Sequence, residues 1–264
     1  TYITHVCDQD IFSPICDEPE VMKKAAELKK KIFGTSDKFV FLYDGRNARR
    51  KQTGYMIYCF KEFLEKYGKD KAALLMHTEP FDPNGQNLHA ILEELNLVNR
   101  EVVISTEKVD QQKLSMLYNI CDCSINISDA EGLGCGIVQS LASGKPVIVN
   151  LTGGLQDQVT DGFRWFGIGV KPASKSVVGS QDVPFIYEDR LAQEDIVEAM
   201  REMFEMPAEQ KHQLDVDCAK WSRERFNFDN FEKQWVDLMT KIYEENGSWD
   251  DRKNYKTWSL KEII

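Results

Sequence analysis

Short apolar runs alternate with segments of helical periodicity between about residue 39 and residue 150 of this chain. The apolar runs are typical of buried strands, and they lie at residues 39–43, 72–76, 102–104, 123–127 and 147–150. Apolar residues recur at helical spacing between these runs, at residues 55–67, 88–97, 113–120 and 137–143. Strands that alternate with helices indicate βαβ units, whose crossovers are almost always right-handed. The sequence therefore predicts an α/β fold with a doubly wound parallel sheet flanked by helices.

The pattern changes after the predicted sheet. Helical periodicity appears at residues 194–204, 208–225 and 231–243. Asp229 or Asn230 is placed to cap the last of these helices. Residues 167–188 contain prolines and glycines, so we expect a long loop there with one or two short strands. The chain divides into a lead-in or inter-domain connector over residues 1–35, a sheet domain over residues 36–226 and a helical C-terminal tail over residues 227–264.

The charge balance and the cysteines exclude several classes of protein. Asp and Glu outnumber Lys and Arg by 43 to 33, and the net charge of −10 disfavours nucleic-acid binding. No apolar run approaches the length of a transmembrane segment, and residues 1–10 lack the regions of a signal peptide. The seven cysteines form no CxxC pair, and the four histidines are scattered. We therefore expect a reduced, cytoplasmic protein without a metal site.

Basic residues crowd the loop that follows the first predicted strand. Residues 45–51 (GRNARRK) open a predicted helix, and a helix N-terminus attracts anions rather than cations. The arrangement is unfavourable unless an anion such as a phosphate lies between these side chains. A solvated basic turn is the alternative, and these residues alone favour neither.

A glycine-rich loop follows the predicted strand at residues 123–127. In residues 129–136 (DAEGLGCG), alternate glycines let the backbone approach a ligand, and Glu131 is placed to accept hydrogen bonds from hydroxyl groups. A capping carboxylate with glycines for tight packing is the alternative. The loop is neither a GxGxxG nor a Walker A motif, so a dinucleotide site is disfavoured. Residues 152–154 (TGG) follow the last predicted strand and by themselves indicate a flexible turn.

Two of these loops match the motif spacing of a known family. Gly45, Arg46 and Lys51 match a G-R-x-x-x-x-K pattern. Residues 131–134 (EGLG) match an E-G-F-G pattern, and residues 142–148 (ASGKPVI) match the A-x-G-x-P-V-I pattern that follows it. The combination is far more specific than any one of the motifs.

Two further segments complete the match. Residues 152–154 match a T/G-G-G loop, and residues 4–14 (THVCDQDIFSP) resemble an N-G-V-D-x-x-x-F-x-P opening segment. From His5 to Tyr243 the chain resembles the C-terminal, donor-binding domain of retaining GT-B glycosyltransferases, in the glycosyl transferases group 1 family. The resemblance implies a Rossmann-like, nucleotide-sugar-binding domain over residues 36–226, one half of a GT-B fold. The stretch GSQDVPFIYEDR is similar to phage- or virus-encoded members.

The resemblance assigns catalytic roles to three residues. Arg46 and Lys51 would bind the diphosphate of a nucleotide sugar and stabilise the charge of the departing nucleoside diphosphate. Glu131 would hold hydroxyl groups of the donor sugar. Because basic side chains replace a metal in this fold, the resemblance implies transfer without metal or cofactor. Replacing Arg46 or Lys51 with Ala is expected to weaken nucleoside-diphosphate binding and to change stability little.

The resemblance also implies a set of substrate-binding residues. They are Gly45, Gly132, Leu133, Gly134, Gln139, Thr152 and Gly153. Gln139 stands where the family has a second glutamate that binds the ribose hydroxyls. An amide still accepts one hydrogen bond and donates another, but without the strength that a charge adds. Nucleotide affinity and preference are the properties that this departure affects.

The resemblance covers only one half of a GT-B enzyme. The N-terminal, acceptor-binding domain is missing, so we expect a fragment, a partner chain that supplies the acceptor domain, or a stand-alone binding module. The acceptor is a glycan, a lipid or a protein. We expect the apolar face of residues 231–243 to meet the missing domain or another copy of the chain. The alternatives to a transferase are a non-catalytic nucleotide-sugar or phospholigand-binding module and a sugar-phosphate epimerase, which the residue 45–51 motif disfavours.

Overall fold

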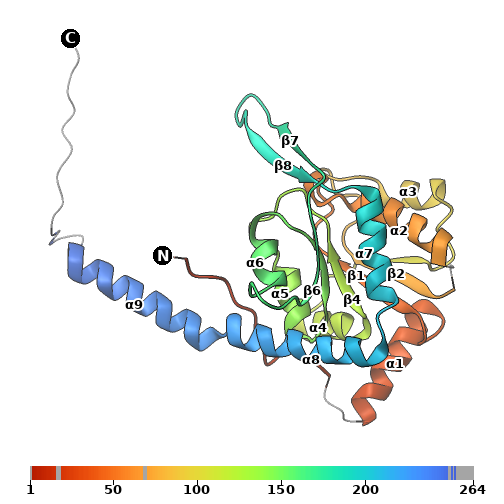
Figure 1. Cartoon of the computed structure of the whole chain (residues 1–264), viewed down its shortest axis with the longest axis horizontal. Coiled ribbons are helices and arrows are strands. Elements are labelled where there is room, and N and C mark those ends of the chain that lie inside the picture. Colours follow the sequence, from red (N-terminus) through yellow and green to blue (C-terminus); the bar gives the residue numbers. More distant parts are fainter. Residues whose placement is uncertain (1, 16–18, 68–69, 249–250, 252, 254–264) are drawn as a thin grey trace.

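A six-stranded parallel sheet forms the centre of the molecule, with the strand order β3-β2-β1-β4-β5-β6 (Figure 1). The computed structural model describes residues 2–15, 19–67, 70–248, 251 and 253. The strands of the sheet are β1 (Phe39–Asp44), β2 (Ala72–His77), β3 (Val102–Ser105), β4 (Cys123–Asn126), β5 (Val147–Asn150) and β6 (Gly167–Val170). The predicted α/β fold with a doubly wound parallel sheet is confirmed, and the first five strands lie where the apolar runs placed them.

The sequence predicted a long loop with one or two short strands over residues 167–188, whereas the structure has three strands that begin in this stretch, and β6 extends the sheet. β6 pairs in parallel with β5, and Gly167 lies opposite Val147. Two of its four residues are glycines, so it has no apolar run that the sequence could reveal. A Cβ atom on Gly167 would lie 1.9 Å from the Val147 carbonyl oxygen, so the close approach of the two backbones requires glycine.

Helices cover both faces of the sheet, as a doubly wound topology requires. They are α1 (Pro19–Phe33), α2 (Thr53–Tyr67), α3 (Leu88–Glu94), α4 (Gln111–Ile120), α5 (Cys135–Ala142), α6 (Gln156–Val159), α7 (Gln193–Phe204), α8 (Ala208–Arg225) and α9 (Phe228–Asn246). Short 3-10 helices are η1 (Arg49–Lys51) and η2 (Gly153–Leu155). The cap of α9 is neither predicted residue: the helix begins earlier, and Asn227 accepts the Asn230 backbone N–H at 3.0 Å.

Alternate side chains of β1 divide the core into two layers. Phe41 and Tyr43 pack with α2, α3 and α7, whereas Val40 and Leu42 pack with α1 and α4. A third cluster joins α5, α6 and α8 around β5. Phe12 and Phe33, which belong to the predicted lead-in, are 1% and 3% exposed and complete the layer beneath α1 and α4.

Two elements project from this body (Figure 1). The strands β7 (Ser174–Val178) and β8 (Ile186–Arg190) form an antiparallel hairpin. Helix α9 extends away from the sheet, and none of its residues is buried. Apolar side chains along α9 are exposed, including Trp235 at 42% and Tyr243 at 62%. Among the described residues, no helix combines the length and apolar character needed to cross a bilayer.

Candidate functional site

The loops singled out in the sequence meet at the carboxyl ends of β1, β4 and β5. These strands are parallel neighbours, so the loops that follow them lie at one edge of the sheet. In open α/β sheets this edge is where ligands bind. The basic loop and η1 follow β1, the glycine-rich loop follows β4, and η2 follows β5.

A cation–carboxylate cluster joins the first two loops. The Lys51 ammonium donates to Glu131 Oε2. Arg50 lies 3.3 Å from the same oxygen and donates to the Ala130 carbonyl at 2.7 Å. The side chains of Lys51 and Glu131 are only 14% and 9% exposed. The structure therefore brings together two of the three predicted catalytic residues, 80 positions apart in the chain.

The environment of Glu131 keeps its carboxylate ionised. Burial alone would raise the pKa of Glu131, but the hydrogen bond from Lys51 and the charges of Lys51 and Arg50 outweigh it and lower the pKa. The cluster therefore combines a charged acceptor with an ammonium that has further protons to donate. Such a pair suits a ligand that carries both hydroxyl groups and phosphate.

Arg46, the third predicted catalytic residue, lies apart from this cluster. Its guanidinium binds Asp82 with two hydrogen bonds, at 2.5 and 3.0 Å. The Arg46 side chain is 61% exposed. The Asp82 side chain is only 9% exposed, and hydrogen bonds from Arg46 and from the Asn84 backbone lower its pKa to about 2. Arg46 is thus the mobile, solvent-facing partner of an ionised carboxylate.

Glycines allow the glycine-rich loop after β4 and the loop after β5 to pack closely against each other. Gly134 has a φ of +84°, and a Cβ atom there would lie 2.6 Å from Leu155. Gly153 has a φ of +48°, and a Cβ atom there would lie 1.9 Å from the Glu131 carbonyl oxygen. Gly132 is exposed, and a Cβ atom there would meet nothing within 4 Å.

Gly134 precedes α5, and no side chain caps the first turn of that helix. The Ile137 N–H donates to the Gly134 carbonyl at 2.9 Å, and the N–H groups of Cys135 and Gly136 at the start of α5 remain available to an anion.

Gln139 lies on α5 within a buried hydrogen-bonded group. Its Oε1 atom is 3.2 Å from the Tyr118 hydroxyl group, which donates to Asp44 Oδ2 at 2.6 Å. Burial raises the pKa of Asp44, and the Tyr118 hydrogen bond opposes that rise. A cavity of about 220 Å³ adjoins this group, and Gln111, Leu133 and Gln139 are among the residues that line it.

The remaining predicted substrate-binding residues make internal contacts. Gly45 donates its backbone N–H to the His77 carbonyl at 3.3 Å. Leu133 accepts a hydrogen bond from the Gln158 amide. Thr152 is 5% exposed, and its hydroxyl group donates to Asp189 of β8 at 2.8 Å. Thr152 therefore connects the third loop to the base of the hairpin.

Sequence reasoning missed a second charged network beside the cluster. Arg190 of β8 binds Asp129 at 2.9 Å and Glu188 at 2.8 Å, and Arg49 also pairs with Glu188. Burial raises the pKa of Asp129 to about 6, although Gln52 and Arg190 partly offset it. Arg49 and Asp129 stood inside the two loops already singled out, but nothing in the sequence indicated that the hairpin would supply their partners.

Comparisons with known proteins identify the family of this chain. The model of the family described as "Glycosyl transferases group 1" matches residues 25–217. A search of curated proteins found no match.

Solved structures share the fold at low sequence identity. Sucrose-phosphate synthase from Thermosynechococcus elongatus is 20% identical with a TM-score of 0.70, over 92% of this chain and 52% of that one. Anabaena HepE, solved with UDP and glucose, is 17% identical with a TM-score of 0.68, over 91% of this chain and 56% of that one. The C-terminal domain of a group 1 family glycosyl transferase from Francisella tularensis is 15% identical with a TM-score of 0.62, over 84% of this chain and 99% of that domain. This chain thus spans about half the length of the first two proteins.

Proposed function

The chain belongs to the glycosyl transferases group 1 family, whose model matches most of it, and from this premise we propose that it is the donor-binding part of a retaining glycosyltransferase. The donor is a nucleotide diphospho-sugar, and transfer needs no metal. The observation that carries the proposal is the cluster of Lys51, Arg50 and Glu131 beside the uncapped N-terminus of α5.

The charges of this cluster suit a departing nucleoside diphosphate. When the bond between the sugar and the diphosphate breaks, negative charge develops on the leaving phosphate oxygen. Lys51 keeps protons to donate while it is bound to Glu131, and the α5 amides add a partial positive charge. Groups that are positioned before the reaction stabilise such charge without reorganisation.

Arg46 completes the phosphate site by leaving Asp82. A phosphate accepts two parallel hydrogen bonds from a guanidinium, as Asp82 does in the structure. The guanidinium of Arg46 is the exposed partner of this pair, so it can turn away from Asp82, and a charge-assisted bond to phosphate would offset the bond that is lost. We therefore place Arg46 and Lys51 on opposite sides of the diphosphate.

Glu131 and Gln139 bind the two sugars of the donor in this proposal. Glu131 is ionised and partly buried, which suits the hydroxyl groups of the transferred sugar. Gln139 lines the 220 Å³ cavity, where we place the ribose and base. Gly132 and Leu133 expose backbone between these two positions, and Gly45, Gly134, Thr152 and Gly153 hold the loops that form them.

Calorimetry with UDP-, GDP- and ADP-linked sugars tests the proposal, with EDTA present to test metal independence. We expect donors that carry one of these three bases to bind, and we expect Lys51→Met to weaken their binding. Failure of all three classes to bind at millimolar concentration, or binding that EDTA abolishes, would contradict it. Retention is tested by the anomeric configuration of the product, measured by NMR once an acceptor is found.

A second candidate is a non-catalytic nucleotide-sugar or phospholigand-binding module. It is supported by the site itself, because the cluster of Lys51, Arg50 and Glu131 is sufficient to bind a phosphate and hydroxyl groups without an acceptor. Donor binding without release of nucleoside diphosphate, in the presence of a broad acceptor mixture, would support this candidate over the transferase.

A further inference from the structure

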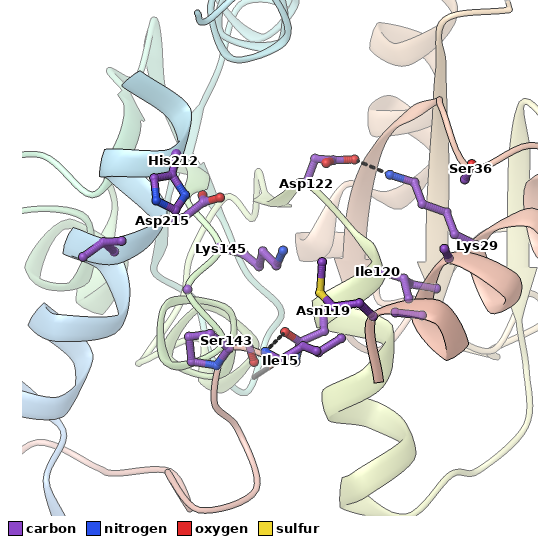
Figure 2. A pocket seen from close by; sticks show the side chains of 16 residues that line it. Ile15, Lys29, Ser36, Asn119, Ile120, Asp122, Ser143, Lys145, His212 and Asp215 are labelled. Carbon is purple, nitrogen blue, oxygen red and sulfur yellow. Dashed lines mark hydrogen bonds and ion pairs between the residues drawn. The ribbon is translucent and has the colours of Figure 1, made fainter. Parts of the chain in front are cut away.

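A second cavity, of about 420 Å³, lies at the opposite end of the strands from the candidate transferase site. Figure 2 shows the side chains that line it. Its walls come from α1, the end of α4, the loops that lead into β4 and β5, and α8. Because Asp122 and Lys145 precede β4 and β5, this is the amino-terminal edge of the strands. The cavity is therefore separate from the loops that follow β1, β4 and β5.

Two ion pairs flank this cavity, one at each of its two carboxylates. Lys29 of α1 donates to Asp122 at 3.0 Å, and Asp122 also accepts the Val40 backbone N–H at 2.8 Å. Lys211 of α8 donates to Asp215 at 2.6 Å. Each carboxylate thus has its own lysine. His212, on the same helix, also lines the cavity.

Lys145, which also lines the cavity, belongs to neither of these ion pairs. In the described part of the chain, its ammonium makes no hydrogen bond and no ion pair, although Asp122 and Asp215 lie near enough to influence it. Figure 2 shows its side chain extending into the cavity between those two aspartates. Burial and the charge of Lys211 lower the pKa of Lys145. A partly buried ammonium without a partner is costly, and an anion within reach of its Nζ atom would remove that cost.

The rest of the lining is largely apolar. Met22 and Ala25 of α1, Ile120 of α4 and Val216 of α8 face the cavity. Sites for small organic molecules combine such a lining with a few polar groups that fix the orientation of the ligand. The cavity therefore offers one unpaired cation within an apolar surround.

We propose that this cavity binds a small organic monocarboxylate, whose carboxylate accepts hydrogen bonds from Lys145 and whose apolar body packs against α1, α4 and α8. The net charge of the site selects a single negative charge. With both aspartates paired, Lys145 is the uncompensated charge among the described residues at this cavity, and a monoanion neutralises it. A phosphate monoester, with close to two charges, would add a net negative charge beside Asp122 and Asp215.

Calorimetry with hexanoate tests the proposal, with hexanol as the uncharged probe of similar shape. We expect hexanoate to bind with a Kd of about 1 mM or tighter, and hexanol and hexyl phosphate each to bind about tenfold or more weakly. Lys145→Met should weaken hexanoate about tenfold or more. It should also raise the melting temperature, because it replaces an unpaired charge with an apolar side chain. Lys113→Met, on the exposed surface of α4, is the matched control and should change neither property.

Three results would overturn the proposal. They are equal binding of hexanol or hexyl phosphate, hexanoate binding that Lys145→Met leaves intact, and displacement of hexanoate by a nucleotide that occupies the transferase site. The first two results do not involve the transferase site, so they decide this proposal whether or not the donor assignment is correct.

Chemical labelling of the unaltered protein gives a second measurement. Reductive methylation with formaldehyde modifies unprotonated lysine amines, and peptide mass spectrometry reports the extent at each lysine. Hexanoate should slow methylation of Lys145 several-fold and leave Lys113 unchanged. Equal rates at Lys145 with and without hexanoate would contradict the proposal.

Discussion

Lys51→Met separates the binding role of the Lys51–Glu131 pair from its structural role. Methionine keeps the apolar stem of lysine and removes the ammonium. Glu131 then keeps Arg50, 3.3 Å away and largely exposed, as its remaining cationic partner. The variant thus leaves a partly buried carboxylate with a weaker partner and removes a cation from the proposed phosphate site.

The structure sets the size of both effects. Loss of one partner from a charged, partly buried pair costs about 1–2 kcal/mol, and a protein of this size then melts about 2–8 °C lower. Loss of a charge-assisted bond to the diphosphate costs about 1.5–3 kcal/mol, or about 10- to 150-fold in affinity. The first figure revises the sequence-based expectation that stability would change little, because the structure places Lys51 on Glu131 and not in solvent.

Thermal unfolding and calorimetry with UDP, GDP and ADP measure these effects. The double variant Lys51→Met/Glu131→Gln should be more stable than Lys51→Met alone, because the carboxylate that lost its partner is gone. Lys61→Met, on the exposed side of α2 with a pair to Glu65 at 2.8 Å, is the matched control and should change neither property.

Two outcomes would refute this reasoning. If Lys51→Met melts at a lower temperature but binds the preferred nucleoside diphosphate unchanged, the pair is structural and the phosphate site is wrongly placed. If the double variant is no more stable than the two single changes predict, Lys51 and Glu131 are not energetically coupled.

Three further predictions concern the surroundings of this pair. Arg46→Ala should lower nucleoside-diphosphate affinity about tenfold. Asp82→Ala should leave that affinity unchanged or increase it, because the arginine is then released. Calorimetry that shows lower affinity in both variants would contradict this prediction. Gln139→Glu should increase the affinity for ribonucleotides more than the affinity for their 2′-deoxy analogues. Equal increases for both in titrations would reject the ribose assignment. Burial raises the pKa of Asp129 to about 6, above the usual value of about 4 for an aspartate. Its contribution to stability is therefore full below about pH 4 and is lost as the pH rises through 6. Asp129→Asn should therefore flatten the dependence of melting temperature on pH between these values, and an unchanged profile would show that Asp129 does not titrate there.

Local sequence was sufficient to predict most of the fold. Continuous apolar runs such as residues 39–43 have few alternatives to a buried strand, and the spacing in α2 and α5 identified helices between them. The prediction failed at β6, because glycines at positions 167 and 169 leave no apolar run. It also missed Asn227 as the cap of α9, because the first turn of that helix carries no distinctive pattern.

The sequence also identified the loops of the candidate site, because glycines and basic residues after buried strands are local features. It could not determine which side chains in those loops contact one another. Lys51 meets Glu131, whereas Arg46 turns to Asp82, and both partners lie far along the chain. Only the parallel order of β1 and β4 brings the first pair together.

The alternation of elements and the chemical character of each loop can be predicted from the sequence, since both depend on neighbouring residues. The pairing of charges depends on the assembled fold. The hairpin supplies Glu188 and Arg190 to the loop residues Arg49 and Asp129. The opposite cavity leaves Lys145 unpaired among segments from four parts of the chain. Charge–charge energies depend on distance and burial, and for residues far apart in sequence these are fixed only when the sheet assembles.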